Sequence, residues 1–194
     1  MKKDDVEMEF DDRILLPEEN HILCPIYTLP LNEFKLKKYC KERGIVNYLP
    51  LRKTWKINNY LKRGKPYQQS QVVLRPMFPS YIFVKMPMDG GRASIMDSRS
   101  AIRILTPSSQ ERFIEDVRAI RSIEQVALEQ EVEFNPEVRV GDRFIIESGV
   151  WAGVTGWLKK KGKHCSWTVE LEIVNQSVQT AIDPSQYKMR RLEG

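Results

Sequence analysis

Covalent chemistry needs a nucleophile, a base or a cluster of metal ligands, and the spacing of such residues in this chain favours none of them. The 194 residues include two histidines, His21 and His164, and neither lies near a serine or cysteine in a nucleophile motif. The three cysteines, Cys24, Cys40 and Cys165, are scattered and form no C-x-x-C pair, which argues against a zinc site or a disulfide framework. We therefore expect no enzymatic activity, no metal and no cofactor, and a reducing, cytoplasmic location.

Three glycines near the C-terminus raise the separate question of a phosphate-binding loop. Gly149, Gly153 and Gly156 are followed by no Lys-Ser or Lys-Thr pair, and strand patterns flank them on both sides. Glycines in that setting are typical of tight turns between strands, where positive φ angles and close strand approach are needed. We interpret them as turn residues and assign no site to them alone.

The clearest chemical signal is the distribution of charge. The net charge is +5, but residues 21–106 contain 16 Lys or Arg and four Asp or Glu, a balance of +12. Residues 1–20 and 107–137 each sum to −5, and residues 138–194 sum to +3. A segment this basic attracts polyanions, nucleic acid above all, whereas a merely solvated face usually carries mixed signs.

The elements that must position this basic segment alternate between strand and helix patterns. Strands are predicted at 22–27, 45–51, 72–74, 81–86 and 101–105, and helices at 31–43, 91–98 and from Ser108 onward. Pro25 indicates an edge strand or a bulge in the first run, and we expect 72–74 to pair with 81–86. The alternation predicts an α+β domain over residues 21–127, with an antiparallel sheet flanked by helices.

Two of these elements carry more detailed patterns. In the strand 81–86 the two-residue period places Ile82, Val84 and Met86 on a core face and Tyr81, Phe83 and Lys85 on the other, which then needs a covering helix or a partner. In the last helix a capping box at Ser108 to Glu111 precedes an apolar stripe of Phe113, Val117, Ile120 and Ile123.

The two ends of the chain differ from this central region. Residues 1–20 are acidic and lack periodicity, so we expect a disordered arm. Residues 128–137 are acidic and glycine-free and contain Asn135-Pro136 near their end, which predicts a linker. Beyond it, residues 138–194 show only short strand patterns with Gly-rich turns, as expected for a small all-β barrel.

Three segments resemble the NusG family. Arg75 to Met86 (RPMFPSYIFVKM) is similar to the R-x-F-F-P-G-Y-V-F-V-x-M segment of its N-terminal domain, and Tyr48 to Leu51 to its F/Y-x-P strand. Residues 140–156 resemble its KOW motif, V-x-V-x-x-G-P-F-A-G-x-x-G. The order and spacing match over residues 21 to about 190. The resemblance implies an N-terminal NusG-type domain followed by an SH3-like KOW barrel.

The resemblance further implies a transcription elongation or antitermination factor that docks on the clamp helices of the largest RNA polymerase subunit and suppresses pausing or termination. The polymerase-binding residues would be Tyr48, Pro76, Phe78, Pro79, Tyr81 and Phe83. Exposed aromatic anchors suit a helical coiled coil. The alternative is that Phe78 and Phe83 lie in the core beneath a helix.

The basic segment would then face the non-template DNA strand and the upstream duplex. The nucleic-acid-binding residues would be Lys35, Lys38, Arg52, Lys53, Lys56, Lys62, Arg63 and Lys65. Trp55, Tyr60 or Tyr67 could stack on bases. The alternative is a lysine-rich hairpin that is only solvated.

The KOW domain would present Trp151, Val154 and Val174 to a second partner, the ribosomal protein NusE or Rho, with Trp151 either a core plug or an exposed contact. Three positions depart from the housekeeping pattern: the opening aromatic strand W-Y-V-V is replaced by His21 to Tyr27, the glycine of F-P-G-Y is Ser80, and an aromatic is Val174. They favour a specialised paralogue of the RfaH or polysaccharide-operon type and argue against Rho-dependent termination.

The rival hypothesis is a ribosome-associated KOW protein that binds structured RNA. Its contacts would be Lys159, Lys160, Lys161, Lys163, Arg190 and Arg191. A simple ribosomal KOW protein has no use for the P-x-F-P-S-Y strand and the basic hairpin, so the elongation factor is preferred.

Overall fold

The computed structural model describes residues 10–62, 65–129, 132–134, 142–161, 164–171, 176–183 and 186–192. The chain forms two compact units. Unit 1 comprises Met1–Pro50 and Phe78–Arg118, and unit 2 comprises Leu51–Met77 and Ala119–Gly194. The basic hairpin, which sequence analysis places in the N-terminal domain, thus belongs to unit 2.

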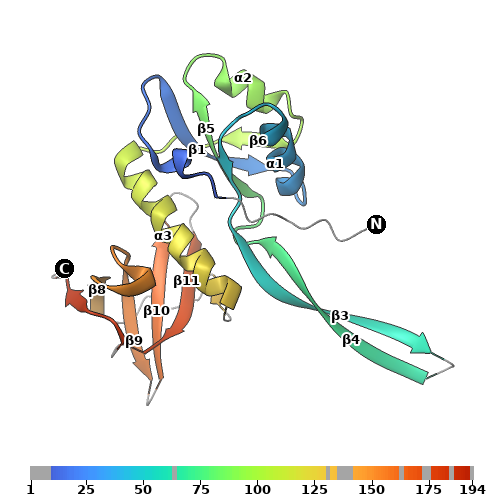
Figure 1. The fold of residues 1–194 in the computed structure, drawn as a ribbon, viewed down its shortest axis with the longest axis vertical. Coiled ribbons are helices and arrows are strands. Elements are labelled where there is room, and N and C mark those ends of the chain that lie inside the picture. Colours follow the sequence, from blue (N-terminus) through green and yellow to red (C-terminus); the bar gives the residue numbers. More distant parts are fainter. Residues whose placement is uncertain are drawn as a thin grey trace. The chain divides into compact units, whose positions relative to one another are not determined.

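Unit 1 is built on a four-stranded antiparallel sheet with the order β2-β5-β1-β6 (Figure 1). β1 (His21–Thr28) lies between β5 (Tyr81–Pro87) and β6 (Ala101–Ile104). β2 (Asn47–Tyr48) adds to the far side of β5. The predicted α+β architecture with antiparallel strands is confirmed.

Both faces of β5 are covered, which explains why Ile82 to Met86 are all buried. On one face lie α1 (Glu33–Glu42) and α2 (Gly91–Met96), which are joined by a 2.7 Å hydrogen bond from the Tyr39 hydroxyl to the Ser94 carbonyl. Gly91 of α2 packs directly on Met86. On the other face, the ring of Phe83 meets that of Phe113 in α3 (Gln110–Glu129). The predicted need for a cover over the second face is met by this helix.

The helix ends follow from local sequence. α1 ends at Gly44, whose φ is +66°, and its closing bonds run from Gly44 N to Lys41 O and from Ile45 N to Cys40 O. This is the Schellman arrangement that glycine favours. α3 begins after Ser109, whose Oγ accepts from the Arg112 amide at 3.2 Å. The predicted box starting at Ser108 is therefore wrong by one residue, because the capping hydroxyl is that of Ser109.

The predicted pairing of 72–74 with 81–86 is wrong. β4 (Lys65–Pro76) instead pairs along its whole length with β3 (Leu51–Lys62), and the two form a separate two-stranded ribbon (Figure 1). Only two residues separate these strands, so their pairing is local and costs little loop-closure entropy. β5 pairs with β1 and β2.

Pro25 does not mark an edge strand, because β1 is internal to the sheet. The Pro25 carbonyl accepts from Leu105 N at 2.9 Å, on the β6 side, and its nitrogen faces the same side. The pairing with β6 is short there and shifts register between Tyr27 and Thr28. The missing N–H therefore removes no bond from the longer β5 ladder.

Residues 10–20 are ordered, which corrects the expectation of a disordered arm for that part; residues 1–9 lie outside the described chain. They include a 3-10 helix, η1 (Asp12–Leu15), in which Ile14 is buried. An apolar anchor in an acidic segment gives it a reason to fold, and the anchor escaped a prediction based on charge.

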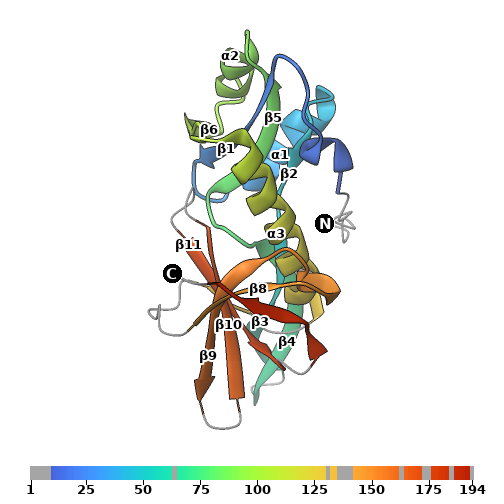
Figure 2. The same ribbon diagram turned by 90° about the vertical axis from the view of Figure 1, so that its left-hand side faces the viewer.

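The C-terminal part of unit 2 is an antiparallel six-stranded sheet, β12-β8-β9-β10-β11-β7, several strands of which lie side by side in Figure 2. Its strands are β7 (Val132–Phe134), β8 (Asp142–Ile146), β9 (Thr155–Lys161), β10 (His164–Leu171), β11 (Gln176–Ile182) and β12 (Met189–Arg191). β7 pairs with β11, so the predicted linker 128–137 contains a strand. Closure of the sheet into a barrel stays a prediction.

Among the described helices, none combines the length and the apolar character needed to cross a membrane.

Candidate protein and nucleic-acid interfaces

Three of the six predicted docking residues lie in the core of unit 1 or at its edge rather than on a surface. Phe83 is fully buried, Phe78 is 1% exposed and Tyr48 is 3% exposed. The Phe83 ring lies 5.7 Å from that of Phe113 and 6.1 Å from that of Tyr48. Because all three are buried, the prediction that these side chains contact a partner is wrong. The alternative of a core beneath a helix is confirmed for Phe83, which α3 covers through Phe113, and Phe78 is a core residue.

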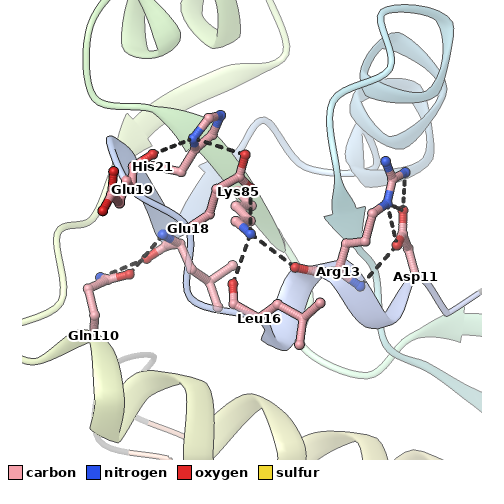
Figure 3. A network of polar contacts seen from close by, with 9 residues as sticks. Asp11, Arg13, Leu16, Glu18, Glu19, His21, Lys85 and Gln110 are labelled. Atoms are coloured by element: carbon pink, nitrogen blue, oxygen red, sulfur yellow. Dashed lines mark hydrogen bonds and ion pairs between the residues drawn. The ribbon is translucent and has the colours of Figure 1, made fainter.

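The N-terminal segment adds a second cover over the same face (Figure 3). The Lys85 ammonium donates to the carbonyls of Arg13, at 3.1 Å, and Leu16, at 2.8 Å, and pairs with the Glu18 carboxylate at 2.7 Å. Lys85 is only 7% exposed, so these partners replace the water that its charge would otherwise need. Phe10 also meets the Tyr48 ring edge-on at 4.9 Å.

This polar cluster perturbs its carboxylates. The hydrogen bond from Lys85 is the main cause that lowers the pKa of Glu18 below its usual value of 4.5. The hydrogen bond from the Arg13 side chain lowers the pKa of Asp11 in the same way. Sequence reasoning missed the cluster, although a lysine on a face that needed a cover was a signal for it.

The exposed aromatic and proline residues gather at the other end of β5. Tyr81 is partly exposed, and its ring lies 5.3 Å from that of the exposed Tyr27 in β1. Ser80 N donates to the buried Glu33 at 2.7 Å, which brings the start of α1 to the same place. We call this surface the tyrosine end; its members are Tyr27, Leu29, Leu31, Phe34, Pro79 and Tyr81.

Two strained backbone positions shape the tyrosine end. Leu31 has φ +64° and is 92% exposed, and Ser80 has φ +66°. A Cβ raises the conformational energy of the backbone in this left-handed region, which is why glycine suits the position that Ser80 holds. The φ of Leu31 belongs to a turn that the Asn32 amide closes on the Leu29 carbonyl at 3.1 Å, and this turn presents the leucine to solvent. Sequence analysis gave no signal for Leu31.

The basic ribbon of β3 and β4 is paired from Leu51↔Pro76 to Lys62↔Lys65. Its base is held in unit 2 by the buried Glu124 of α3, which accepts from Leu51 N at 2.7 Å and pairs with Arg121. Residues 51–76 contain no Asp or Glu. The two strands of the ribbon therefore carry basic side chains and no acidic ones.

The register sorts the ribbon into two faces, because directly paired residues share a face and alternate residues change it. One, the tyrosine face, has Arg52, Thr54, Lys56, Asn58, Tyr60, Lys65, Tyr67, Gln69, Gln71, Val73 and Arg75. The other, the apolar face, has Leu51, Lys53, Trp55, Ile57, Asn59, Leu61, Pro66, Gln68, Ser70, Val72, Leu74 and Pro76.

The structure therefore groups only some of the predicted nucleic-acid residues. Arg52, Lys56 and Lys65 share the tyrosine face, whereas Lys53 is on the apolar face. Arg63 and the side chain of Lys62 lie outside the described chain. Lys35 and Lys38 belong to α1 in unit 1, where Lys38 lies 3.8 Å from Glu42.

The predicted KOW contacts are buried where they are described. Trp151 is 2% exposed and Val154 3%, so the prediction of a partner contact is wrong for both, and Trp151 is a core plug. Gly149 and Gly153 have φ +77° and +84°, and the turn they allow bonds Gly153 N to Ile146 O at 2.7 Å. Val174 lies outside the described residues.

The rival RNA-binding surface is only partly described. Arg190 pairs with Glu147 at 2.9 Å, and its hydrogen bond lowers the pKa of that carboxyl. The side chains of Lys159, Lys160, Lys161 and Lys163 lie outside the described chain.

The described cysteines are unsuited to catalysis. Burial raises the pKa of the Cys24 thiol to about 11 and that of Cys40 to about 12, which keeps both protonated at neutral pH. Within the described ranges, no three His, Cys, Asp or Glu side chains are grouped as metal ligands.

A comparison with known families gives a match. The NusG family model, described as transcription termination factor nusG, matches residues 25–124. That stretch contains the second half of β1, the other three strands of the sheet of unit 1, α1, α2, the ribbon and most of α3. A comparison with curated proteins finds no match.

Proposed function

The chain belongs to the NusG family of transcription elongation and termination factors, and we propose that it is an elongation or antitermination factor that binds RNA polymerase through unit 1. The observation that carries the proposal is the family match over residues 25–124. The docking site would be the clamp helices of the largest polymerase subunit, and the cytoplasm the place of action.

The contact surface that we propose is the tyrosine end. Tyr81 and Pro79 remain from the residues inferred from sequence, whereas Pro76 belongs to the ribbon in unit 2. Tyr27, Leu31 and Phe34 join the first two. Exposed apolar patches with aromatic anchors are typical of protein interfaces, and a coiled coil offers ridges of apolar side chains that fit them. The ribbon would lie on the non-template strand or the upstream duplex.

Such a factor acts without chemistry of its own. A protein that binds the active conformation of polymerase more tightly than the paused one shifts the population toward elongation by that difference in affinity. Simultaneous contact with the clamp and the DNA would favour the closed clamp. The C-terminal sheet, as a KOW domain, would be offered to NusE or Rho, with contact residues other than the buried Trp151 and Val154.

Three positions support a specialised paralogue of the RfaH or polysaccharide-operon type. His21 begins β1 where the housekeeping pattern has an aromatic, Ser80 holds a left-handed glycine position, and Val174 replaces an aromatic. Substitution at positions that the general factor uses would remove some of its partners, and Rho in particular.

Binding of purified polymerase tests the proposal. Wild type should bind core polymerase, and Tyr81→Ala and Leu31→Ala should each weaken binding by about 1–3 kcal/mol, the range of aromatic and apolar anchors. Leu16→Ala, an exposed leucine outside the tyrosine end, is the matched control and should bind as wild type does. Capture of ribosomal subunits without polymerase would instead favour the RNA-binding hypothesis.

A further inference from the structure

The ribbon carries one pair of aromatic rings on its charged face. Tyr60 and Tyr67 are directly paired, with ring centroids 5.3 Å apart and planes inclined by 22°. The two residues are 43% and 44% exposed. A stacked pair of this kind, near the tip of a projecting ribbon, leaves flat aromatic surface open to solvent.

We propose that Tyr60 and Tyr67 form a base-stacking platform for single-stranded nucleic acid, and that the flanking cations of the tyrosine face hold its phosphates. The inference rests on the proposed function for the presence of nucleic acid, and it deepens that function by naming the ligand as an unpaired strand. Aromatic side chains stack on bases of any sequence once these are unpaired. Bases inside a duplex are already stacked on each other and offer no free face.

The same face also carries basic side chains, which would attract an anion. Arg52 and Arg75 are directly opposite each other, an arrangement that is unfavourable for like charges in a ribbon without acidic residues. Burial, and then the charge of Arg75, lowers the pKa of Arg52. Lys65 lies on the same face near the other end of the ribbon. A phosphate chain along this face would meet basic side chains on both sides of the rings.

The platform lies between the two arginines and Lys65. The register pair that contains Lys65 is ten positions from the arginines, which is about 33 Å in an extended strand. Tyr67 is two positions from Lys65, and Lys56 lies between the tyrosines and the arginines. An extended strand of several nucleotides could therefore keep its phosphates on cations while one or two bases rest on the rings.

The apolar face supplies the contrast. Trp55 is 72% exposed and pairs with Val72, and its neighbours on that face include Ile57 and a single cation, Lys53. The larger ring of Trp55 therefore lies on the face opposite to the one where Arg52, Lys56 and Lys65 would hold a strand. The proposal excludes Trp55 from the platform, although it is the aromatic residue that stacks best in general.

Fluorescence anisotropy of the full chain with labelled oligothymidylate of about twelve nucleotides tests the platform. The double variant Tyr60→Ala/Tyr67→Ala should bind about tenfold more weakly, with an unchanged slope of log affinity against log salt, because stacking releases no counterions. Tyr60→Phe/Tyr67→Phe should retain binding. Trp55→Ala, the matched control on the opposite face, should stay within about twofold of wild type. Lys56→Gln/Lys65→Gln should instead flatten the slope.

A second double variant controls for the case in which the alanine substitutions disrupt the structure of the ribbon. Tyr60→Leu/Tyr67→Leu keeps an apolar cross-strand pair without aromatic faces and should bind as weakly as the alanine variant. The platform is refuted if the leucine and alanine variants bind as wild type does, or if Trp55→Ala weakens binding as much as they do. A duplex of the same sequence bound as tightly as the single strand would also refute it. None of these outcomes depends on polymerase, whose binding tests the proposed function separately.

Discussion

At the residue scale, Tyr81 and Phe83 share a strand face by the two-residue period, yet the first is partly exposed and the second fully buried. The difference arises because α3 covers Phe83 through Phe113 but leaves the end of β5 open. Phe83→Ala should cost about 3–5 kcal/mol of unfolding free energy through a core cavity. Tyr81→Ala should stay within about 1 kcal/mol, as surface substitutions usually do.

Urea denaturation of the two variants measures these free energies directly. Equal losses would place Tyr81 in the core and remove the tyrosine end as a docking surface. Ile82→Ala, on the opposite and fully buried face, is the control and should lose about 2–5 kcal/mol.

The Lys85 cluster makes a pH prediction. Because the folded-state pKa of Glu18 is lowered, its ion pair stabilises the protein above the unfolded pKa, near 4.5, and this stabilisation is lost as pH falls through the folded value. Glu18→Gln should therefore be less stable than wild type at neutral pH. The difference should shrink below pH 4.5, as measured by denaturation midpoints across the pH range. A constant difference would mean that Glu18 does not act through its charge.

Single residues differ in how far the sequence reveals them. The left-handed position of Gly44 could be assigned from sequence, since glycine is strongly preferred where a helix ends, whereas the serine at position 80 does not by itself reveal its positive φ. Tyr48 and Lys85 could not, because their surroundings come from segments more than 30 positions away in the chain. Burial of that kind is set by tertiary contacts, which no local pattern encodes.

At the element scale, the start of α3 separates two neighbouring serines. Ser109 caps the helix, so Ser109→Ala should cost about 1 kcal/mol of unfolding free energy. Ser108→Ala is the matched control and should change it by less than about 0.5 kcal/mol. Equal losses would show that both hydroxyls cap the helix, and a larger loss at Ser108 would restore the box inferred from sequence.

Periodicity explains which elements could be predicted. The stripe of Phe113, Val117, Ile120 and Ile123 was predicted, and all four are buried, because a helix face needs only local spacing. The partner of β4 could not be predicted, since alternation defines faces but not neighbours. The sorting of the ribbon into two faces depends on that pairing, so it too required the structure.

At the scale of the whole molecule, the chain combines an apolar patch in unit 1 with an acid-free cationic ribbon in unit 2. The net charge of +5 conceals this division, because acidic residues concentrate before residue 21 and between residues 107 and 137. The sequence could predict both surfaces in outline. It could not tell which aromatic residues are displayed, since burial decides that.

The lifetime of RNA polymerase at a defined pause, measured with purified components, tests the central claim most directly. The full chain should shorten that lifetime, and Tyr81→Ala at the same concentration should shorten it less while retaining its thermal stability. Raising the concentration of the variant should restore the effect, because only affinity is lost. Pause lifetimes that stay unchanged at saturating concentrations of the folded wild-type protein would contradict the claim.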